Sequence, residues 1–207
     1  MPETRVVTVY TVHELEDRAR DRAYGSWLEN FDHAWGEDNR KTLEVFANLF
    51  PIRVGRWMYD DCTWDVPFTF EADRSEIADL SGWRLATYIW NNYRESLFQG
   101  RWYHKSSRVN GVYGSKFRHS KILLEHSCVL TGYCMDEDIL EPIYDFLARP
   151  DQTTFRELMA RCLEAWGRAC SRDLEADSSR EAFIDHCDDN DLLFEWSGRV
   201  FRGSACA

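Results

Sequence analysis

The sequence of 207 residues has no run of about 18 apolar residues, so no segment predicts a membrane-spanning helix. It contains no glycine-rich phosphate loop and neither the G-x-S-x-G nor the H-E-x-x-H pattern of common hydrolases. Its opening, Met-Pro-Glu-Thr-Arg, does not resemble a secretory signal peptide. We therefore expect a cytoplasmic protein that is not an enzyme and uses no cofactor.

Cysteine pairs at close, regular spacing are absent as well. The seven cysteines are odd in number and irregularly spaced, and no C-x-x-C occurs. This pattern is typical of reduced thiols, most of them small core residues, and not of a disulfide framework. Zinc prefers four nitrogen or sulfur ligands in close pairs, a spacing that the nearest candidates do not have, so we predict no metal site at His119, His126, Cys128 and Cys134.

A carboxylate cluster is expected at one hairpin tip, where a magnesium ion would permit nuclease chemistry. The residues are Asp60, Asp61 and Asp65. Aspartate-rich turns are far more common than such catalytic sites, so we interpret this segment as an ordinary turn.

What the chain does have is enough apolar residues for a folded core, at 44% hydrophobic and 14% aromatic with nine tryptophans. Four tryptophans lie on apolar helical faces and are expected in the core: Trp27, Trp35, Trp90 and Trp166. Four others lie on strands or at their ends, where exposure would make them interface anchors: Trp57, Trp64, Trp102 and Trp196.

Apolar periodicity and capping signals predict the elements. We expect helices from Thr11 to about Trp35 and over 38–50, 82–98, 136–148, 155–175 and about 178–187. We expect strands over 5–10, 52–59 and 63–72, two strands around Asn110-Gly111, and a short hairpin over 192–201. Because strands and helices come in blocks, the predicted fold is one α+β domain over 1–207, a mostly antiparallel sheet of hairpins packed with four to six helices.

Charge is distributed unevenly along the chain, whose net value is −11. Residues 101–129 carry 6 basic and 1 acidic groups, whereas residues 130–207 carry 8 basic and 17 acidic groups. An acidic body does not suit general nucleic-acid binding but suits a basic partner, such as the nucleic-acid channel of another protein.

Two candidate binding surfaces follow from this distribution. The acidic patch, which would imitate DNA phosphates, consists of Asp173, Glu175, Asp177, Glu181, Asp185, Asp188, Asp189 and Asp191. The basic hairpin, which would follow a nucleic-acid strand or an acidic protein patch, consists of Arg101, Trp102, Lys105, Arg108, Lys116, Arg118 and Lys121. Each also has an interpretation without function. The acidic patch would be a solvated loop, and the basic hairpin would be an exposed strand pair whose cations protect a sheet edge.

Three stretches together carry a resemblance: "VVTVYTVHELEDRARDRA" at the start, "VGRWMYDDCTWDVPFTFEA" in the middle and "FRELMARCLEAWGRACSRDLEADSSREAFIDHCDDNDLLFEWSGRVF" at the end. This pattern resembles a group of bacteriophage and prophage accessory proteins of hypothetical or antitoxin-like type. The group's middle strand has a Gln-Gly-Asp-Gly turn, where this chain has Tyr59-Asp60-Asp61-Cys62-Thr63 without glycine.

The resemblance implies a phage counter-defence protein, such as an anti-CRISPR inhibitor, acting in the host bacterial cytosol on a host defence protein or ribonucleoprotein, with a CRISPR effector as the expected partner. The alternative is a nucleic-acid-binding or antitoxin-like regulator that uses the basic hairpin.

Overall fold

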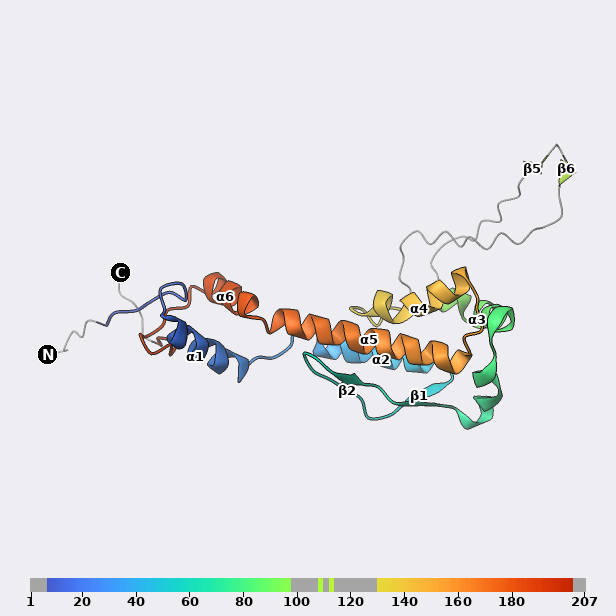
Figure 1. Cartoon of the computed structure of the whole chain (residues 1–207), viewed down its shortest axis with the longest axis horizontal. Helices are drawn as coiled ribbons and strands as arrows, with labels where there is room; N and C mark the ends of the chain where they lie inside the picture. The colour runs from blue at the N-terminus through green and yellow to red at the C-terminus, as the bar shows by residue number, and fades with distance from the viewer. Residues whose placement is uncertain (1–6, 98–107, 110–111, 114–129, 203–207) are drawn as a thin grey trace. The chain divides into compact units, whose positions relative to one another are not determined.

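The computed structural model describes residues 7–97, 108–109, 112–113 and 130–202 (Figure 1). Its helices are α1 (Asp17–Leu28), α2 (Gly36–Leu49), the 3-10 helix η1 (Ala72–Asp79), α3 (Gly82–Leu97), α4 (Asp136–Ala148), α5 (Phe155–Asp177) and α6 (Arg180–Asp189). Its strands are β1 (Ile52–Val54), β2 (Met58–Tyr59), β3 (Trp64–Asp65), β4 (Phe68–Phe70), β5 (Arg108–Val109) and β6 (Val112–Tyr113).

The chain divides into two compact units. The first unit combines Met1–Ala34 with Asp173–Ala207, and the second is Trp35–Arg172. The last turn of α5 therefore belongs to the first unit, although most of that helix belongs to the second.

The second unit has the larger core, built around α5. Apolar residues recur along α5 at three- and four-residue steps, which places Leu158, Cys162 and Trp166 in that core. Trp166 is fully buried, and its indole Nε1 donates a hydrogen bond to the backbone oxygen of Asn39 in α2 at 3.1 Å. The tryptophan therefore fills the core and satisfies its one polar atom there.

A long hairpin, made of two successive antiparallel strand pairs, packs on this core. β1 pairs antiparallel with β4, with Ile52 opposite Phe70, and β2 pairs with β3 nearer the turn. The rings of Trp57 and Tyr59 meet Trp166 edge to face, with centroids 5.3 and 5.7 Å apart. The hairpin thus covers α5 with aromatic rings.

The first unit has a smaller core, to which α1 and α6 both contribute. The ring of Phe183 packs against those of Tyr24 and Trp27, with centroids 5.7 and 5.5 Å apart. The hydroxyl of Tyr24 donates to the backbone oxygen of Ser178 at 2.7 Å. The two ends of the unit meet where Tyr10 and Phe194 exchange backbone hydrogen bonds of 2.9 and 2.8 Å.

The expected mixture of helices and strands is confirmed, but the expectation of a mostly antiparallel sheet is wrong. The described strands are two or three residues long and form three separate two-stranded pairs, so helices dominate. Within the predicted strand 5–10, the structure describes 7–10, of which Tyr10 alone forms a bridge. No helix within the described ranges is long and apolar enough to cross a membrane.

Helix α1, over Asp17–Leu28, is shorter at both ends than the helix predicted from Thr11 to about Trp35. The carboxylate of Glu14 accepts hydrogen bonds from the backbone and hydroxyl of Thr11, at 2.8 and 3.0 Å, and closes a turn that precedes α1. After Leu28 the side-chain amide of Asn30 donates to the backbone oxygen of Ser26 at 2.8 Å. Trp35 consequently lies outside α1 and is 42% exposed, which corrects its expected core position.

Trp166→Ala should lower the free energy of unfolding by about 3–5 kcal/mol, because it empties a large core site and leaves neighbouring aromatic rings unpacked. The control is Trp83→Ala, which removes a side chain that is 61% exposed and should cost less than about 0.5 kcal/mol. Urea unfolding followed by circular dichroism measures both. Equal losses would contradict the placement of Trp166.

Gly198→Ala should destabilise the first unit by more than about 1–2 kcal/mol, because Gly198 has a φ of +86° and an added Cβ would overlap the backbone carbonyl of Ala19. Gly25 in α1 has open space where a Cβ would stand, so Gly25→Ala should stabilise the helix by roughly 0.5–1 kcal/mol. Thermal unfolding of both variants tests these opposite signs.

Candidate functional site

Nearly all the net charge of the chain belongs to the first unit. Residues 1–34 and 173–207 carry 16 acidic groups, 7 arginines and no lysine, which gives −9 of the total −11. The second unit carries 20 acidic and 18 basic groups and is close to neutral. The carboxylates of the first unit therefore make the strongest electrostatic feature of the chain.

Helix α6 presents part of this charge as an ordered row. The hydroxyl of Ser179 caps the helix by accepting from the backbone N–H of Ala182 at 3.1 Å. Phe183 and Cys187 are buried on the side that faces the core of the unit. The exposed side carries what we call the α6 carboxylate row, at four-residue steps: Glu181, Asp185 and Asp189.

The end of α6 places further carboxylates where helix electrostatics disfavours them. Asp191 has a φ of +49°, and backbone hydrogen bonds from Asp191 to Asp188 and from Leu192 to Cys187 complete a Schellman-type stop. A helix C-terminus carries partial negative charge and favours cations, yet Asp188 and Asp189 lie in the last turn. Helix stability does not explain these acidic residues.

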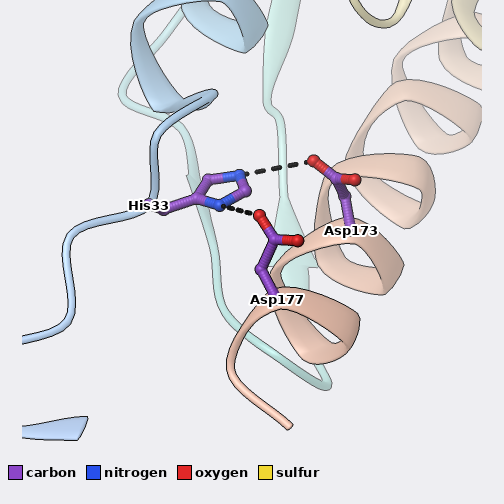
Figure 2. Close-up of side chains that lie close together, drawn as sticks. All are labelled: His33, Asp173 and Asp177. Atoms are coloured by element: carbon purple, nitrogen blue, oxygen red, sulfur yellow. Dashed lines mark ion pairs between the residues drawn. The ribbon is translucent and has the colours of Figure 1, made fainter. Parts of the chain in front are cut away.

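Helix α5 also has acidic residues at its C-terminal end, where Asp173 and Asp177 lie one turn apart. Figure 2 shows the imidazole of His33 between their two carboxylates. The Nε2 atom lies 3.5 Å from an oxygen of Asp173, and the Nδ1 atom lies 3.3 Å from an oxygen of Asp177. His33 comes from the segment between α1 and α2, and 10% of its side chain is exposed.

A second histidine faces the acidic end of α6. The Nε2 atom of His13 lies 2.9 and 3.1 Å from the two carboxylate oxygens of Asp188. The structure therefore divides the predicted acidic patch in two. Asp173 and Asp177 are partly buried beside His33, and Asp188 faces His13 but stays exposed. The remaining members are exposed and face no histidine in the described ion pairs: Glu175, Glu181, Asp185, Asp189 and Asp191.

One predicted aromatic anchor stands out in the first unit. Trp196 is 76% exposed, beside the turn in which the backbone N–H of Gly198 donates to the oxygen of Glu195 at 2.9 Å. Trp57 and Trp64 are partly buried, and Trp102 lies outside the described residues. The sequence prediction missed Trp83 and Tyr133, which are 61% and 69% exposed in the second unit.

Most residues of the predicted basic hairpin lie outside the described part of the chain, so they are not placed in this site. Arg108 is the first residue of β5, which pairs with β6 around Asn110-Gly111 as predicted, but its side chain is not described. The other members lie outside the described residues: Arg101, Trp102, Lys105, Lys116, Arg118 and Lys121. The nucleic-acid-binding alternative stays a prediction. The expectation of no metal site at His119, His126 and Cys128 also stays a prediction, because these residues lie outside the described part of the chain.

The aspartate turn of the second unit is organised by Asp60. Its carboxylate accepts hydrogen bonds from the backbone of Cys62, the hydroxyl of Thr63 and the backbone of Thr63, which together hold the Asp60 pKa at about 2. Hydrogen bonding to the carboxylates of Asp61 and Asp60 raises the pKa of the Cys62 thiol to about 11. The carboxylate of Asp60 closes the turn, which accounts for an aspartate at this position without a bound ion. Asp65 lies in β3, away from the turn.

One depression in the second unit is open and polar. It measures about 650 Å³ and is lined by Arg53, Arg74, Asn92 and Tyr93, among others, with no histidine or cysteine. Burial and the neighbouring hydroxyl of Tyr88 raise the pKa of Tyr93, so this phenol stays neutral. The lining does not bring together the acid, base and nucleophile that a reaction centre needs.

Comparisons of the chain with protein-family models, with curated proteins and with solved structures give no match. The resemblance to phage accessory proteins therefore stays a prediction.

Asp60→Ala should lower the urea midpoint of unfolding above about pH 5, and this difference from the wild type should shrink as pH falls. The Asp60 pKa is lower in the folded chain than the ordinary aspartate value of 3.8, so its contribution to stability is present above that pH and disappears toward pH 2. Urea titrations from about pH 5 to 2 measure the difference. Asp61→Ala, which removes one exposed carboxylate from the same turn, is the control. A difference that stays constant with pH would contradict the role of Asp60.

Proposed function

We propose that this chain binds a partner macromolecule through the exposed carboxylates of its first unit, and that the partner presents a lysine- and arginine-rich surface of the kind that holds nucleic acid. The specific form of the proposal is a phage counter-defence protein that occupies the nucleic-acid channel of a host defence complex, with a CRISPR effector as the partner. The observation that carries the binding proposal is the concentration of −9 in one unit.

The α6 carboxylate row supports this proposal through its geometry. Carboxylates four residues apart on a helix are about 6 Å apart along the axis, so the row forms a regular line of negative charge. Duplex DNA also presents regular negative charge, at one phosphate per about 1.7 Å of axis over both strands. A basic channel that accepts phosphates would attract such a row at long range and speed association at low salt.

Trp196 supports the proposal through its exposure. A large aromatic side chain that is 76% exposed leaves apolar area in contact with water, and burying it at an interface would recover that free energy. Tryptophan is among the residues that most often dominate binding energy. The carboxylates would steer the encounter, and Trp196 would slow dissociation.

The second unit offers a matched control for the charge itself. Helix α4 carries Glu137, Glu141 and Asp145 at the same four-residue steps, and all three are exposed. Neutralising that row removes the same charge at the same spacing from the unit that is nearly neutral. Neither triple change should alter stability by more than about 0.5 kcal/mol per site.

Neutralising the α6 carboxylate row with Glu181→Gln, Asp185→Asn and Asp189→Asn should weaken partner binding by at least about tenfold, which corresponds to about 1.4 kcal/mol. The assay uses a guide-loaded CRISPR effector from a defence-carrying host with a labelled DNA duplex. Displacement of the duplex by the chain is followed by fluorescence anisotropy at low and at high salt. The α4 triple variant, Glu137→Gln, Glu141→Gln and Asp145→Asn, should displace the duplex as the wild type does.

Three results would count against the proposal. If the wild-type chain displaces no duplex, the channel assignment is wrong, and affinity capture from the host then tests the broader claim of a basic partner. If both triple variants weaken equally, general charge and not the α6 carboxylate row governs binding. If added salt leaves binding unchanged, the interaction is not electrostatic.

A further inference from the structure

The cluster of His33, Asp173 and Asp177 in the first unit does not fit the exposed surface just described. Its carboxylates are about two-thirds shielded, with side-chain exposures of 34% and 39%, and the imidazole is nine-tenths buried. One ligand atom from each residue lies within 4.8 Å of the other two. We propose that these three side chains bind one divalent transition-metal ion, with zinc as the best fit.

The spacing of the two aspartates prepares the site. Residues four apart on a helix lie on the same face, so Asp173 and Asp177 project together from the last turns of α5 (Figure 2). His33 reaches them from the segment that follows α1, which hydrogen bonds from Asn30 to Trp27 and from Phe31 to Leu28 hold in a compact turn. Two separate parts of the first unit thus converge on one point.

The ligand atoms of the three residues lie close together, but they do not yet surround one point. Zinc binds imidazole nitrogen and carboxylate oxygen at about 2.0–2.2 Å, so ligand atoms in a tetrahedral site lie about 3.3–3.5 Å from each other. Here Nε2 lies 3.5 Å from an oxygen of Asp173 and Nδ1 lies 3.3 Å from an oxygen of Asp177. One zinc ion binds only one ring nitrogen, so binding requires one aspartate side chain to turn toward the nitrogen that the other aspartate already faces. A water molecule would complete the four ligands.

The charge of the cluster favours a doubly charged ion. Two carboxylates carry −2, and the C-terminus of α5 adds about half a negative charge in the same place. A protonated imidazole offers only +1, whereas a divalent ion bound to neutral imidazole offers +2. No basic residue lies in the last turn of α5 to offset this negative charge.

The donor set selects the ion. One imidazole and two carboxylates suit zinc and its first-row neighbours, because imidazole is a borderline ligand. Calcium takes six to eight oxygen ligands, and magnesium retains waters and rarely takes nitrogen. The cluster at Asp60, Asp61 and Cys62 is the other group of this type among the described residues. It is the weaker candidate, because Asp61 and Cys62 are exposed and the Asp60 carboxylate already accepts hydrogen bonds within its own turn.

Zinc titration of the full chain after chelator treatment should reveal one site whose occupation raises the thermal midpoint of unfolding, because binding to the folded state alone stabilises it. Asp173→Asn with Asp177→Asn should weaken that site by more than about 100-fold, beyond the 10–100-fold that loss of an outer-shell partner costs. The control, Glu137→Gln with Glu141→Gln, removes two exposed α4 carboxylates at the same spacing and should leave binding unchanged. Isothermal calorimetry and thermal unfolding measure the effect.

Cobalt supplies a readout that does not depend on stability. Co²⁺ bound by His33 and the aspartates should show the visible absorption of a low-coordinate ion, and His33→Gln should abolish it. Cys62→Ser should keep the absorption, which separates this site from the exposed thiol. If zinc binds equally to the double aspartate variant, or if neither ion binds the wild type, the cluster is a histidine held by two carboxylates and the metal proposal is wrong. Because the α6 carboxylate row is not involved, this failure would leave the partner-binding proposal standing.

Discussion

Repulsion between like charges is the constraint on which the first unit depends. Sixteen carboxylates and seven arginines share a unit whose described core has only seven buried residues, with Phe183 and Phe194 the aromatic ones. The packing of Phe183 against Tyr24 and Trp27 opposes that repulsion. An ion pair between Arg180 and Asp21 at 2.6 Å also opposes it, and the Arg180 guanidinium lies over the Tyr24 ring. Arginine suits this position because its planar group pairs with a carboxylate and stacks on a ring at once.

The same constraint explains where the histidines lie. His33 and His13 face carboxylates at or near the C-terminal ends of α5 and α6, where aspartates oppose the helix dipole. Departures from local preference that are compensated by distant residues are common at functional sites. Asp173 and Asp177 are partly buried beside His33, whereas Asp188 stays on the surface beside His13. The structure thus separates the acidic residues by burial and by partner, which a single list of charges could not do.

Local signals predicted much of the fold, and long-range contacts account for the rest. The Thr154–Glu157 capping box forms at the start of α5, because a cap depends on residues only three apart. The cap of α6 is Ser179, one residue after the Ser178 at which the pattern Ser178-Ser179-Arg180-Glu181 predicted it. The same pattern at Thr11 and Glu14 forms a turn instead, since the chain there leads into the contact between Tyr10 and Phe194. Trp35 and Trp166 have the same apolar spacing, yet one is exposed and the other buried, because burial depends on partners far away in sequence. No periodicity could have placed His33 beside aspartates 140 and 144 residues further along the chain.

The absence of lysine from the first unit has a practical and biological consequence. The four lysines of the chain, Lys41, Lys105, Lys116 and Lys121, all belong to the second unit. Lysine-directed chemistry, whether acetylation, ubiquitin transfer or covalent coupling to a dye, therefore has no target side chain in the first unit. Its acidic surface would keep its full charge while the rest of the chain was modified.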